Sequence, residues 1–345
     1  MTLQENKVKL SVIVPTYKVE AYIEKCIRSL EDQDLPKENY EIIVINDGSP
    51  DRCRKIVEDL QKEFSNIVLI NQENRGVSMA RNKGIAIAKG KYIMAIDPDD
   101  YILPNSFGSV ISRALIDNLD VLYLGYDFLD QKDKLVWSTD YNKLEGQIYS
   151  GVEGYFASRG NKVRDPDRSV AILYRNGLLE KFNIAYPKNV PYLEDGLFLL
   201  KVFSVAKRVA FDADHFYIRT TRPGSATNSD LFFSDKAING FVTAANDLRE
   251  FAAKQSLNSE QAGLINHGIV KFVILPLNAA ISGKNLYRYY MIVKRLSITG
   301  FKKLDTTGMP KFYLEKAHQY NFSPWYFATI YFIELALKKT RLHLN

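Results

Sequence analysis

Three aspartates close the short segment "YIMAIDPDDY" at residues 92–101. Asp97, Asp99 and Asp100 directly follow apolar residues that are typical of a buried strand. In extended backbone, residues two positions apart point the same way, so Asp97 and Asp99 can face one ligand while Pro98 fixes the turn between them. Carboxylates this close repel one another unless a cation neutralises them. The segment therefore indicates a site for Mg²⁺ or Mn²⁺, which bind carboxylates and complete their shells with phosphate oxygens.

A polar turn ahead of a helix at "LPNSF" is the alternative explanation, with Asp100 near the start of that helix. The neighbouring segments favour a ligand site, because three earlier apolar runs also end in polar or turn residues. The stretches that follow those runs are "PTYKVE", "NDGSPD" and "NQENRGVSMARN". A cap or a turn explains any one of these stretches, whereas four in succession point to a shared ligand.

The elements that position these stretches alternate along the chain. Short apolar, β-branched runs, typical of strands buried on both faces, occupy residues 10–15, 40–46, 66–71 and 91–97. Segments with helical spacing lie between them, at residues 19–31, 51–64 and 76–89. This series predicts an α/β fold with a doubly wound, mostly parallel, Rossmann-like sheet. Ligands bind at the carboxyl ends of such strands, so the polar stretches should converge there.

Several other chemistries find no match in the sequence. There is no G-x-G-x-x-G fingerprint, and neither Gly-Lys pair is followed by the Ser or Thr that a P-loop requires. The four histidines and two cysteines show no paired spacing for zinc. Cys26 and Cys53 are expected to be free thiols. Dinucleotide redox chemistry and zinc chemistry are therefore disfavoured.

Four segments together resemble the signature stretches of the family 2 inverting glycosyltransferases of the bacterial surface-polysaccharide type, in their order and spacing. The segments are "SVIVPTYKVEAYIEKCIRSL", "VINDGSPD", "ENRGVSMARNKGI" and "IDPDD", which contains the D-x-D motif. The resemblance is strong over roughly residues 8–130. It implies the GT-A fold, a nucleotide-diphosphate-sugar donor, most often a UDP-sugar, and Mn²⁺ or Mg²⁺ as cofactor.

The resemblance also implies roles for single residues. Asp97 would contact the ribose, and Asp99 would bind the metal that bridges the diphosphate, with Asp100 as a second metal ligand. Pro98 stands where a serine is expected, and its side chain is not a ligand. The residues expected at the nucleotide are Pro15, Thr16, Tyr17, Glu20, Asp47, Arg81 and Asp97.

Inverting transfer also needs a base that takes the proton of the acceptor hydroxyl. The segment "VPYLEDGLFLLKVF" at residues 190–203 offers Glu194 and Asp195 ahead of a helix-like run. An acidic helix start that the macrodipole favours is the alternative explanation. The family resembles this segment too, with an acidic pair shortly before an aromatic residue, here Phe198. By that resemblance Asp195 is the base and Glu194 has a supporting role.

The stretch "FYIRTTRPGSATN" at residues 216–228 joins two arginines to a Pro-Gly turn. It is interpreted as a lid that lays Arg219 or Arg222 on the diphosphate, with a solvent loop as the alternative. The family often has a Tyr-x-Arg followed by Gly-Ser at this place. His215, just before the stretch, is interpreted as a packed or exposed histidine, with metal ligation as the alternative.

We expect two regions in the chain, a GT-A domain at residues 1–230 and a helical region at residues 231–345. Residues 8–130 form the nucleotide-binding half of the first domain, and residues 131–230 form its acceptor half. The segment "AGLINHGIVKFVILPLNAAI" is expected to be a kinked packing helix. Residues 261–304 contain no acidic residue, and an aromatic tail at residues 323–345 ends in a basic cluster, Lys338, Lys339 and Arg341. Packing in a helical subdomain and docking on an anionic membrane surface both remain open for this region.

The rest of the composition sets broad expectations. The net charge of +6 is modest for 345 residues, the N-terminus shows no signal-peptide pattern, and no apolar run reaches the roughly 20 residues that span a bilayer. We expect a cytoplasmic protein, peripheral on the inner face of the membrane, with no nucleic-acid partner. The expected acceptor is a saccharide or lipid-linked saccharide in capsule, exopolysaccharide or lipopolysaccharide synthesis.

Two alternatives to a transferase of this kind stay open. A nucleotidyltransferase on a similar sheet should carry a glycine-rich phosphate loop after the first strand, and "PTYKVE" has no glycine. A non-catalytic subunit that binds sugar nucleotides or membranes is disfavoured by the presence of Asp47, Asp97, Asp99 and Asp195.

Overall fold

The computed structural model describes residues 8–159, 167–221 and 234–342. By its internal contacts the chain forms two compact units. The first unit comprises Met1–Lys188 and Ala206–Thr227, and the second comprises Asn189–Val205 and Asn228–Asn345. Residues 189–205 therefore group with the C-terminal helices, although they lie inside the segment 1–230 that we expected to form one domain.

The first unit is built on a nine-stranded mixed sheet in the order β3-β2-β1-β4-β8-β6-β9-β5, with β7 paired to β6. Its strands are β1 (Leu10–Thr16), β2 (Tyr40–Asp47), β3 (Ile67–Gln72), β4 (Tyr92–Ala95), β5 (Tyr101–Ile102), β6 (Val121–Leu129), β7 (Leu135–Ser138), β8 (Ile172–Arg175) and β9 (Val209–Arg219). Strands β1 to β4 pair in parallel, and β6 pairs in parallel with β9, whereas β8 runs antiparallel between β4 and β6. The predicted α/β fold with a mostly parallel sheet is confirmed.

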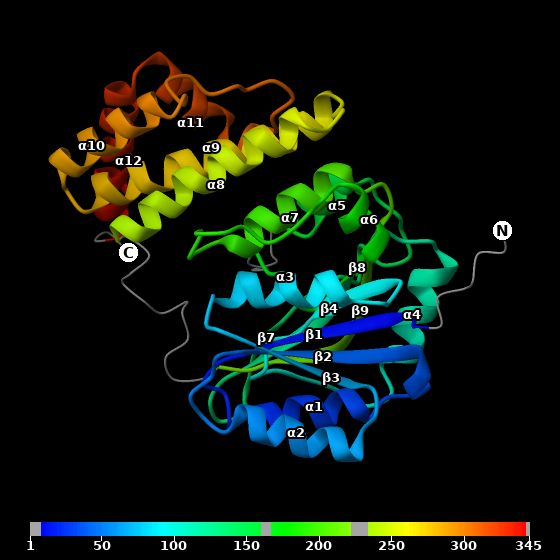
Figure 1. Cartoon of the computed structure of the whole chain (residues 1–345). Helices are drawn as coiled ribbons and strands as arrows, with labels where there is room; N and C mark the ends of the chain where they lie inside the picture. Colours follow the sequence, from blue (N-terminus) through cyan, green and yellow to red (C-terminus); the bar gives the residue numbers. More distant parts are fainter. Residues whose placement is uncertain (1–7, 160–166, 222–233, 343–345) are drawn as a thin grey trace. The chain divides into compact units, whose positions relative to one another are not determined.

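Helices cover both faces of this sheet, because alternate side chains of each buried strand point to opposite sides. The helices of the first unit are α1 (Ile23–Glu31), the short η1 (Lys37–Asn39), α2 (Cys53–Glu63), α3 (Val77–Ile87), α4 (Phe107–Ile116), α5 (Gly151–Ala157) and α6 (Asn176–Lys181). Figure 1 shows α1 and α2 on one side of the sheet and α3 on the other. Val12 and Val14 of β1 share a core cluster with α1, α2 and α4.

On the opposite face, α3 approaches the sheet closely. Ile43 and Ile45 of β2 form a separate apolar cluster with Ala80 of α3. A Cβ added at Gly84 of α3 would lie 2.5 Å from Cγ2 of Ile13, so glycine lets this helix approach β1 closely. The close approach fixes α3, which carries one of the predicted nucleotide-binding residues.

The second unit is helical. It consists of α7 (Glu194–Val205), α8 (Asp235–Ala253), α9 (Ser259–Ser282), α10 (Leu286–Ile298), α11 (Lys311–Phe322) and α12 (Pro324–Leu342). Helix α9 is its centre, in contact with each of the other five, and Figure 1 shows α8 and α9 side by side. Lys201 of α7 is bound to Asp247 of α8 at 2.5 Å, which joins two of these helices through a largely buried ion pair.

Helix α9 corrects one expectation. It has 24 residues and an 18-residue window of mean hydropathy 1.6, so by length and composition it could cross a membrane. The expectation that no segment is long and apolar enough was therefore wrong. In the structure, however, 72% of that window is buried, as in the core helix of a soluble protein. The helix contains Pro276 in its interior, as expected for the packing helix that the sequence predicts here.

Candidate active site

Asp47 ends β2 and organises the loop that follows β3. Its carboxylate is 3% exposed. Oδ1 accepts hydrogen bonds from the side-chain amide of Gln72 at 2.7 Å and the backbone N–H of Arg75 at 2.9 Å, and Oδ2 accepts the N–H of Gly76 at 2.8 Å. Gly76 has a φ of 84°, a left-handed conformation that favours glycine. Because each carboxylate oxygen has two lone pairs, Oδ2 retains the capacity to accept one more hydrogen bond.

The end of β1 lies beside Asp47, since the two strands are paired in register. Pro15 and Thr16 are buried within β1, and the Thr16 hydroxyl donates to the Ile45 carbonyl at 3.2 Å. Tyr17, the next residue, is 40% exposed at the strand end. Its aromatic face is thus available to a flat ligand at this edge of the sheet.

Glu20 connects the β1–α1 and β2–α2 loops. Its carboxylate accepts the backbone N–H of Arg52 at 2.9 Å and pairs with the Arg52 guanidinium at 3.4 Å. Asp51 makes the reverse link, because its Oδ2 accepts the N–H of Glu20 at 3.1 Å. Burial raises the pKa of Asp51, but hydrogen bonds from Ser49 and Cys53 outweigh burial and lower the pKa to about 2. The structure thus gives Glu20 a loop-joining role, and its predicted nucleotide contact stays a prediction.

A buried arginine on α3 holds the first aspartate of "DPDD". Arg81 is 4% exposed, and its Nη2 donates to Oδ1 of Asp97 at 2.8 Å. The guanidinium carbon also lies 5.2 Å from the centre of the Tyr186 ring. The Asp97 side chain remains 36% exposed, so one edge of this carboxylate faces solvent while Arg81 fixes the other.

Asp100 is held by residues at the end of β9. Its Oδ2 accepts the Tyr217 hydroxyl at 2.7 Å, and its Oδ1 accepts the N–H of Thr220 at 2.8 Å. The N–H of Asp97 in turn donates to the Tyr217 oxygen at 3.4 Å. Burial raises the pKa of Asp100 well above its usual range, and the charges of Asp97 and Asp99 raise it further, while the two hydrogen bonds oppose the rise.

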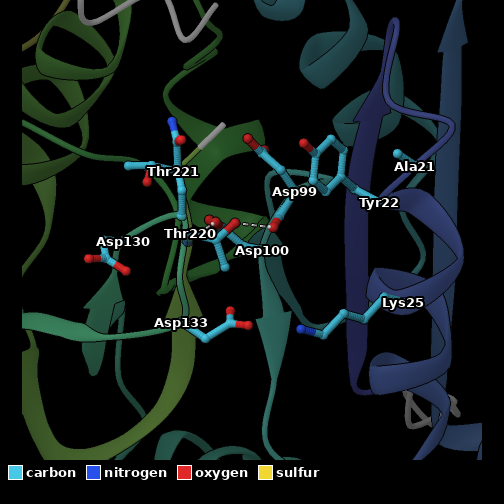
Figure 2. Close-up of a pocket in the computed structure, with 10 residues that line it drawn as sticks. Ala21, Tyr22, Lys25, Asp99, Asp100, Asp130, Asp133, Thr220 and Thr221 are labelled. Atoms are coloured by element: carbon cyan, nitrogen blue, oxygen red, sulfur yellow. Dashed lines mark hydrogen bonds between the residues drawn. The ribbon is translucent and has the colours of Figure 1, made fainter. Parts of the chain in front are cut away.

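Asp99 stands between these two anchored carboxylates and lines a pocket of about 310 Å³. Its backbone carbonyl accepts the Thr220 hydroxyl at 2.6 Å, which attaches the turn to the end of β9. Figure 2 shows the pocket, with Lys25 of α1 and Asp133 of the β6–β7 turn pointing toward one another. Lys25 also lies 3.8 Å from the centre of the Tyr101 ring. Acidic side chains outnumber basic ones among the described residues that line this pocket.

The turn suits a divalent ion that binds together with a phosphate ligand. Within the described part of the chain, no cluster of three or more His, Cys, Asp or Glu side chains is arranged to hold a metal alone. Mg²⁺ and Mn²⁺ commonly use one or two carboxylates and take their other ligands from water and substrate phosphates. Asp99, with the exposed edge of Asp97, fits that mode.

Glu194 and Asp195 lie in the first turn of α7, so this segment is the acidic helix start that we gave as the alternative explanation. They belong to the second unit, and both side chains are half-buried. Leu193, directly before them, has a φ of 60°, which is unusual for a branched side chain. Strained backbone of this kind is often found at functional sites. The assignment of Asp195 as base stays a prediction.

The predicted diphosphate residues are only partly described. Arg219 ends β9 with its guanidinium carbon 5.4 Å from the centre of the Phe128 ring, and Arg222 lies outside the described residues. His215 sits earlier on β9, and its Nδ1 lies 3.1 Å from Oδ1 of Asp127. The histidine is thus packed beside a carboxylate, in line with the interpretation we favoured.

Residues 97–100 form the aspartate turn, and the residues that hold this turn in place were not predicted from the sequence. Tyr217 and Thr220 lie more than 100 positions after Asp100, and no local pattern connects them to it. The one signal was the Tyr-x-Arg pattern, which we connected with a lid. In the structure Tyr217 is fully buried and supports the turn.

The chain is similar to known proteins in sequence and in fold. Residues 11–175, just under half of the chain, match the model of "Glycosyl transferase family 2". The "Uncharacterized glycosyltransferase EpsJ" of Bacillus subtilis is 34% identical over 218 residues, which cover 63% of this chain and 62% of that protein. The "Poly(ribitol-phosphate) beta-glucosyltransferase" of Bacillus spizizenii is 30% identical over 61% of this chain and 32% of its own length. The chain thus spans less than two thirds of either relative.

Solved structures share the fold of this chain. Staphylococcus aureus TarS 1–349, solved in complex with UDP-GlcNAc, has a TM-score of 0.68 at 20% identity, covering 96% of this chain and 92% of TarS 1–349. The mannosyltransferase PcManGT of Pyrobaculum calidifontis, solved with GDP-Man and Mn²⁺, has a TM-score of 0.50 at 14% identity, covering 94% and 87%. At these identities the likeness concerns the fold.

Proposed function

We propose that this chain is a metal-dependent, inverting glycosyltransferase that moves a sugar from a UDP-sugar to a saccharide or lipid-linked saccharide of a cell-surface polymer. The observation that carries the proposal is the convergence of Asp47, the Arg81–Asp97 pair and Asp99 at the carboxyl ends of neighbouring parallel strands. The match of residues 11–175 to the glycosyltransferase family model supports glycosyl transfer as the reaction class. The name of the B. spizizenii relative supports a polymer acceptor.

The hydrogen bonds of Asp47 indicate which nucleobase the donor carries. The free lone pair on Oδ2 can accept a ring N–H, which uracil and guanine have and cytosine lacks. Tyr17 offers an aromatic surface for stacking, and Pro15, Thr16 and Arg81 shape the same edge of the sheet. The UDP-GlcNAc complex of TarS supports uracil, and the GDP-Man complex of PcManGT makes guanine the second candidate.

Asp99, with Asp100 beside it, would hold Mn²⁺ or Mg²⁺ together with the diphosphate, where the ion would neutralise the charge of the leaving group. The exposed edge of Asp97 would contact the ribose. Asp100 positions this turn through Tyr217 and Thr220, and Arg219 and Arg222 would add positive charge near the diphosphate. The Mn²⁺ in the PcManGT complex supports a divalent ion in this fold.

Asp195 acts as the general base in this proposal. Its carboxylate takes the proton of the acceptor hydroxyl while the hydroxyl oxygen forms the new bond to the anomeric carbon. The bond from that carbon to the diphosphate oxygen breaks, and UDP leaves with the bonding electrons. Glu194 orients the acceptor. The support for Asp195 is the family resemblance of "LEDGLF" and its place in the first turn of α7.

Product analysis tests the proposal. The chain is incubated with UDP-glucose, UDP-galactose, UDP-GlcNAc or GDP-mannose and a panel of saccharide acceptors, and the released nucleotide and the anomeric configuration are followed by NMR. We expect UDP release with inversion, and loss of turnover with EDTA that Mn²⁺ restores. Release of pyrophosphate would instead indicate a nucleotidyltransferase, retention of configuration would contradict the mechanism, and donor binding without turnover on any acceptor would favour a non-catalytic subunit.

A further inference from the structure

Helix α10 presents an apolar stripe to solvent. Tyr287, Met291 and Ile298 are spaced so that they lie on one face of the helix, and they are 74%, 44% and 76% exposed. The same helix buries three other residues inside the unit: Tyr289, Ile292 and Leu296. The helix is thus apolar on two faces. One face packs inside the unit, and the other is left exposed to solvent.

Helix α12 carries a second exposed stripe. Its spacing places Trp325, Tyr326, Phe332 and Ile333 on one face, and each is between 45% and 55% exposed. The two helices are neighbours, because the Tyr289 hydroxyl of α10 donates to the Pro324 carbonyl, and the Tyr289 and Trp325 rings lie 5.3 Å apart. Exposed aromatic side chains on adjacent helices are typical of an interaction surface.

The charged side chains of α10 itself are all basic. Lys294 is exposed on the same face as Tyr287 and Ile298, and residues 261–304 hold seven Lys or Arg and no Asp or Glu. An acidic protein surface or anionic lipids would complement this charge. Lipids fit better because the exposed stripes mix aliphatic residues with Tyr and Trp, which favour the boundary between headgroups and acyl chains.

A pocket of about 600 Å³ adjoins the stripe, between α8 and α10. Tyr287 and Met291 belong both to the stripe and to the pocket wall, and Arg288 and Arg295 supply its positive charge. Arg295 donates to the side-chain carbonyl of Asn239. Arg288 pairs at 3.0 Å with Asp235, whose side chain is 93% exposed, so solvent weakens this pair and a phosphate can replace the carboxylate.

We propose that the second unit docks on an anionic bilayer through the exposed faces of α10 and α12, with the phosphate of an anionic phospholipid bound by Arg288 and Arg295 in the α8–α10 pocket. The stripe enters the headgroup region, and Lys294 faces the lipid phosphates. This docking surface is independent of the transfer reaction proposed above. Its function would be to keep the chain where a lipid-linked acceptor is found.

Vesicle sedimentation of the full chain tests the proposal. We expect pelleting with phosphatidylcholine vesicles that contain phosphatidylglycerol, little pelleting with pure phosphatidylcholine, and release at high salt. Lys294→Glu should weaken partitioning by about tenfold or more, since each basic residue near an anionic surface contributes about fivefold. Lys181→Glu, at an exposed lysine on α6, is the matched control and should bind as wild type.

The apolar contribution has its own control. Met291→Ser with Ile298→Ser should reduce binding, whereas Ile116→Ser, at an 82% exposed isoleucine on α4, should not. Trp325 also reports insertion directly, because the chain has two tryptophans and Trp137→Phe leaves Trp325 alone. Its fluorescence should shift to the blue with anionic vesicles and stay unchanged with neutral ones.

The pocket is tested with soluble ligands. A short-chain phosphatidylglycerol should bind the wild type and lose affinity in Arg295→Ala, while inorganic phosphate at the same concentration should bind more weakly, because it lacks the apolar part.

Four outcomes would overturn the proposal. They are equal pelleting with neutral vesicles, no pelleting with either kind, binding of a soluble polyanion through Lys294 without vesicle binding, and a homodimer that Met291→Ser with Ile298→Ser dissociates and that does not bind vesicles.

Discussion

The polar strand ends of the first unit, with the aspartate turn at residues 97–100, differ from helices α10 and α12 of the second unit in whether their side chains have partners within the protein. At the strand ends of the first unit, Asp47, Asp97 and Asp100 each accept hydrogen bonds from the protein, so their geometry is set before any ligand binds. On α10 and α12, large apolar side chains face solvent. A preorganised polar site predicts chemistry on a small ligand, whereas an exposed apolar face predicts a surface that another body covers.

The largest expected effect is on the rate of sugar transfer, and it comes from changing Asp195, the proposed general base. Asp195→Asn keeps the size of the side chain and removes its basicity, so the transfer rate should fall by about 10²–10⁴-fold while UDP binds as in the wild type. Steady-state rates and calorimetric UDP titrations measure the two quantities. Glu194→Gln is the neighbouring control, with a smaller loss. Wild-type transfer by Asp195→Asn would show that another group is the base.

Removing the arginine that holds Asp97 should give the next largest effect. Arg81→Met leaves the side chain nearly as long but removes the buried partner of an ion pair whose carboxylate is 36% exposed. The free energy of unfolding of the first unit should therefore fall by about 1–2 kcal/mol, less than for a fully buried pair. Urea unfolding measures the loss. Arg54→Met breaks the exposed Arg54–Glu58 pair on α2 and should change stability by about 0.5 kcal/mol or less. Similar values for the two variants would contradict the view of a preorganised site.

The loop that joins the β1 and β2 strand ends predicts a smaller, pH-dependent effect. The folded pKa of Asp51, about 2, lies below the roughly 3.9 of an unfolded aspartate. Its contribution is therefore complete above about pH 4 and is lost as pH falls toward 2. With solvent screening, the gap in stability between the wild type and Asp51→Asn should be on the order of 1 kcal/mol at neutral pH. Thermal unfolding at a series of pH values should show this gap closing in acid, and a constant gap would reject the pKa assignment.

Much of the fold could be predicted because its signals are local. The four parallel strands followed from apolar runs, and their polar ends met at one edge as expected. Strand β8 was not predicted, although it lies between β4 and β6, because its pairing joins segments about 80 residues apart. The grouping of residues 189–205 with the C-terminal helices was missed for the same reason.

The site divides in a similar way. The spacing of Asp97 and Asp99 drew attention to a turn that the structure places at the strand ends, whereas the Arg81–Asp97 pair was not expected. The nucleotide and metal roles of these residues stay predictions. The protein donors to Asp100 could not be found, since Tyr217 reaches it across 117 positions of sequence. Exposure of α10 and α12 was equally hidden, because an apolar helical face looks the same in sequence whether the protein or another body covers it.

The measurement that tests the central claim most directly is calorimetric titration of UDP, GDP and CDP, each with and without Mn²⁺, into the wild type and Asp99→Ala. Asp133→Ala, at an exposed carboxylate in the same pocket, is the control. We predict tight UDP binding that requires Mn²⁺, is lost in Asp99→Ala and persists in Asp133→Ala, with CDP weakest because cytosine has no ring N–H for Asp47. Binding of UDP by Asp99→Ala with undiminished affinity and metal dependence would contradict the assignment of the aspartate turn as the donor site.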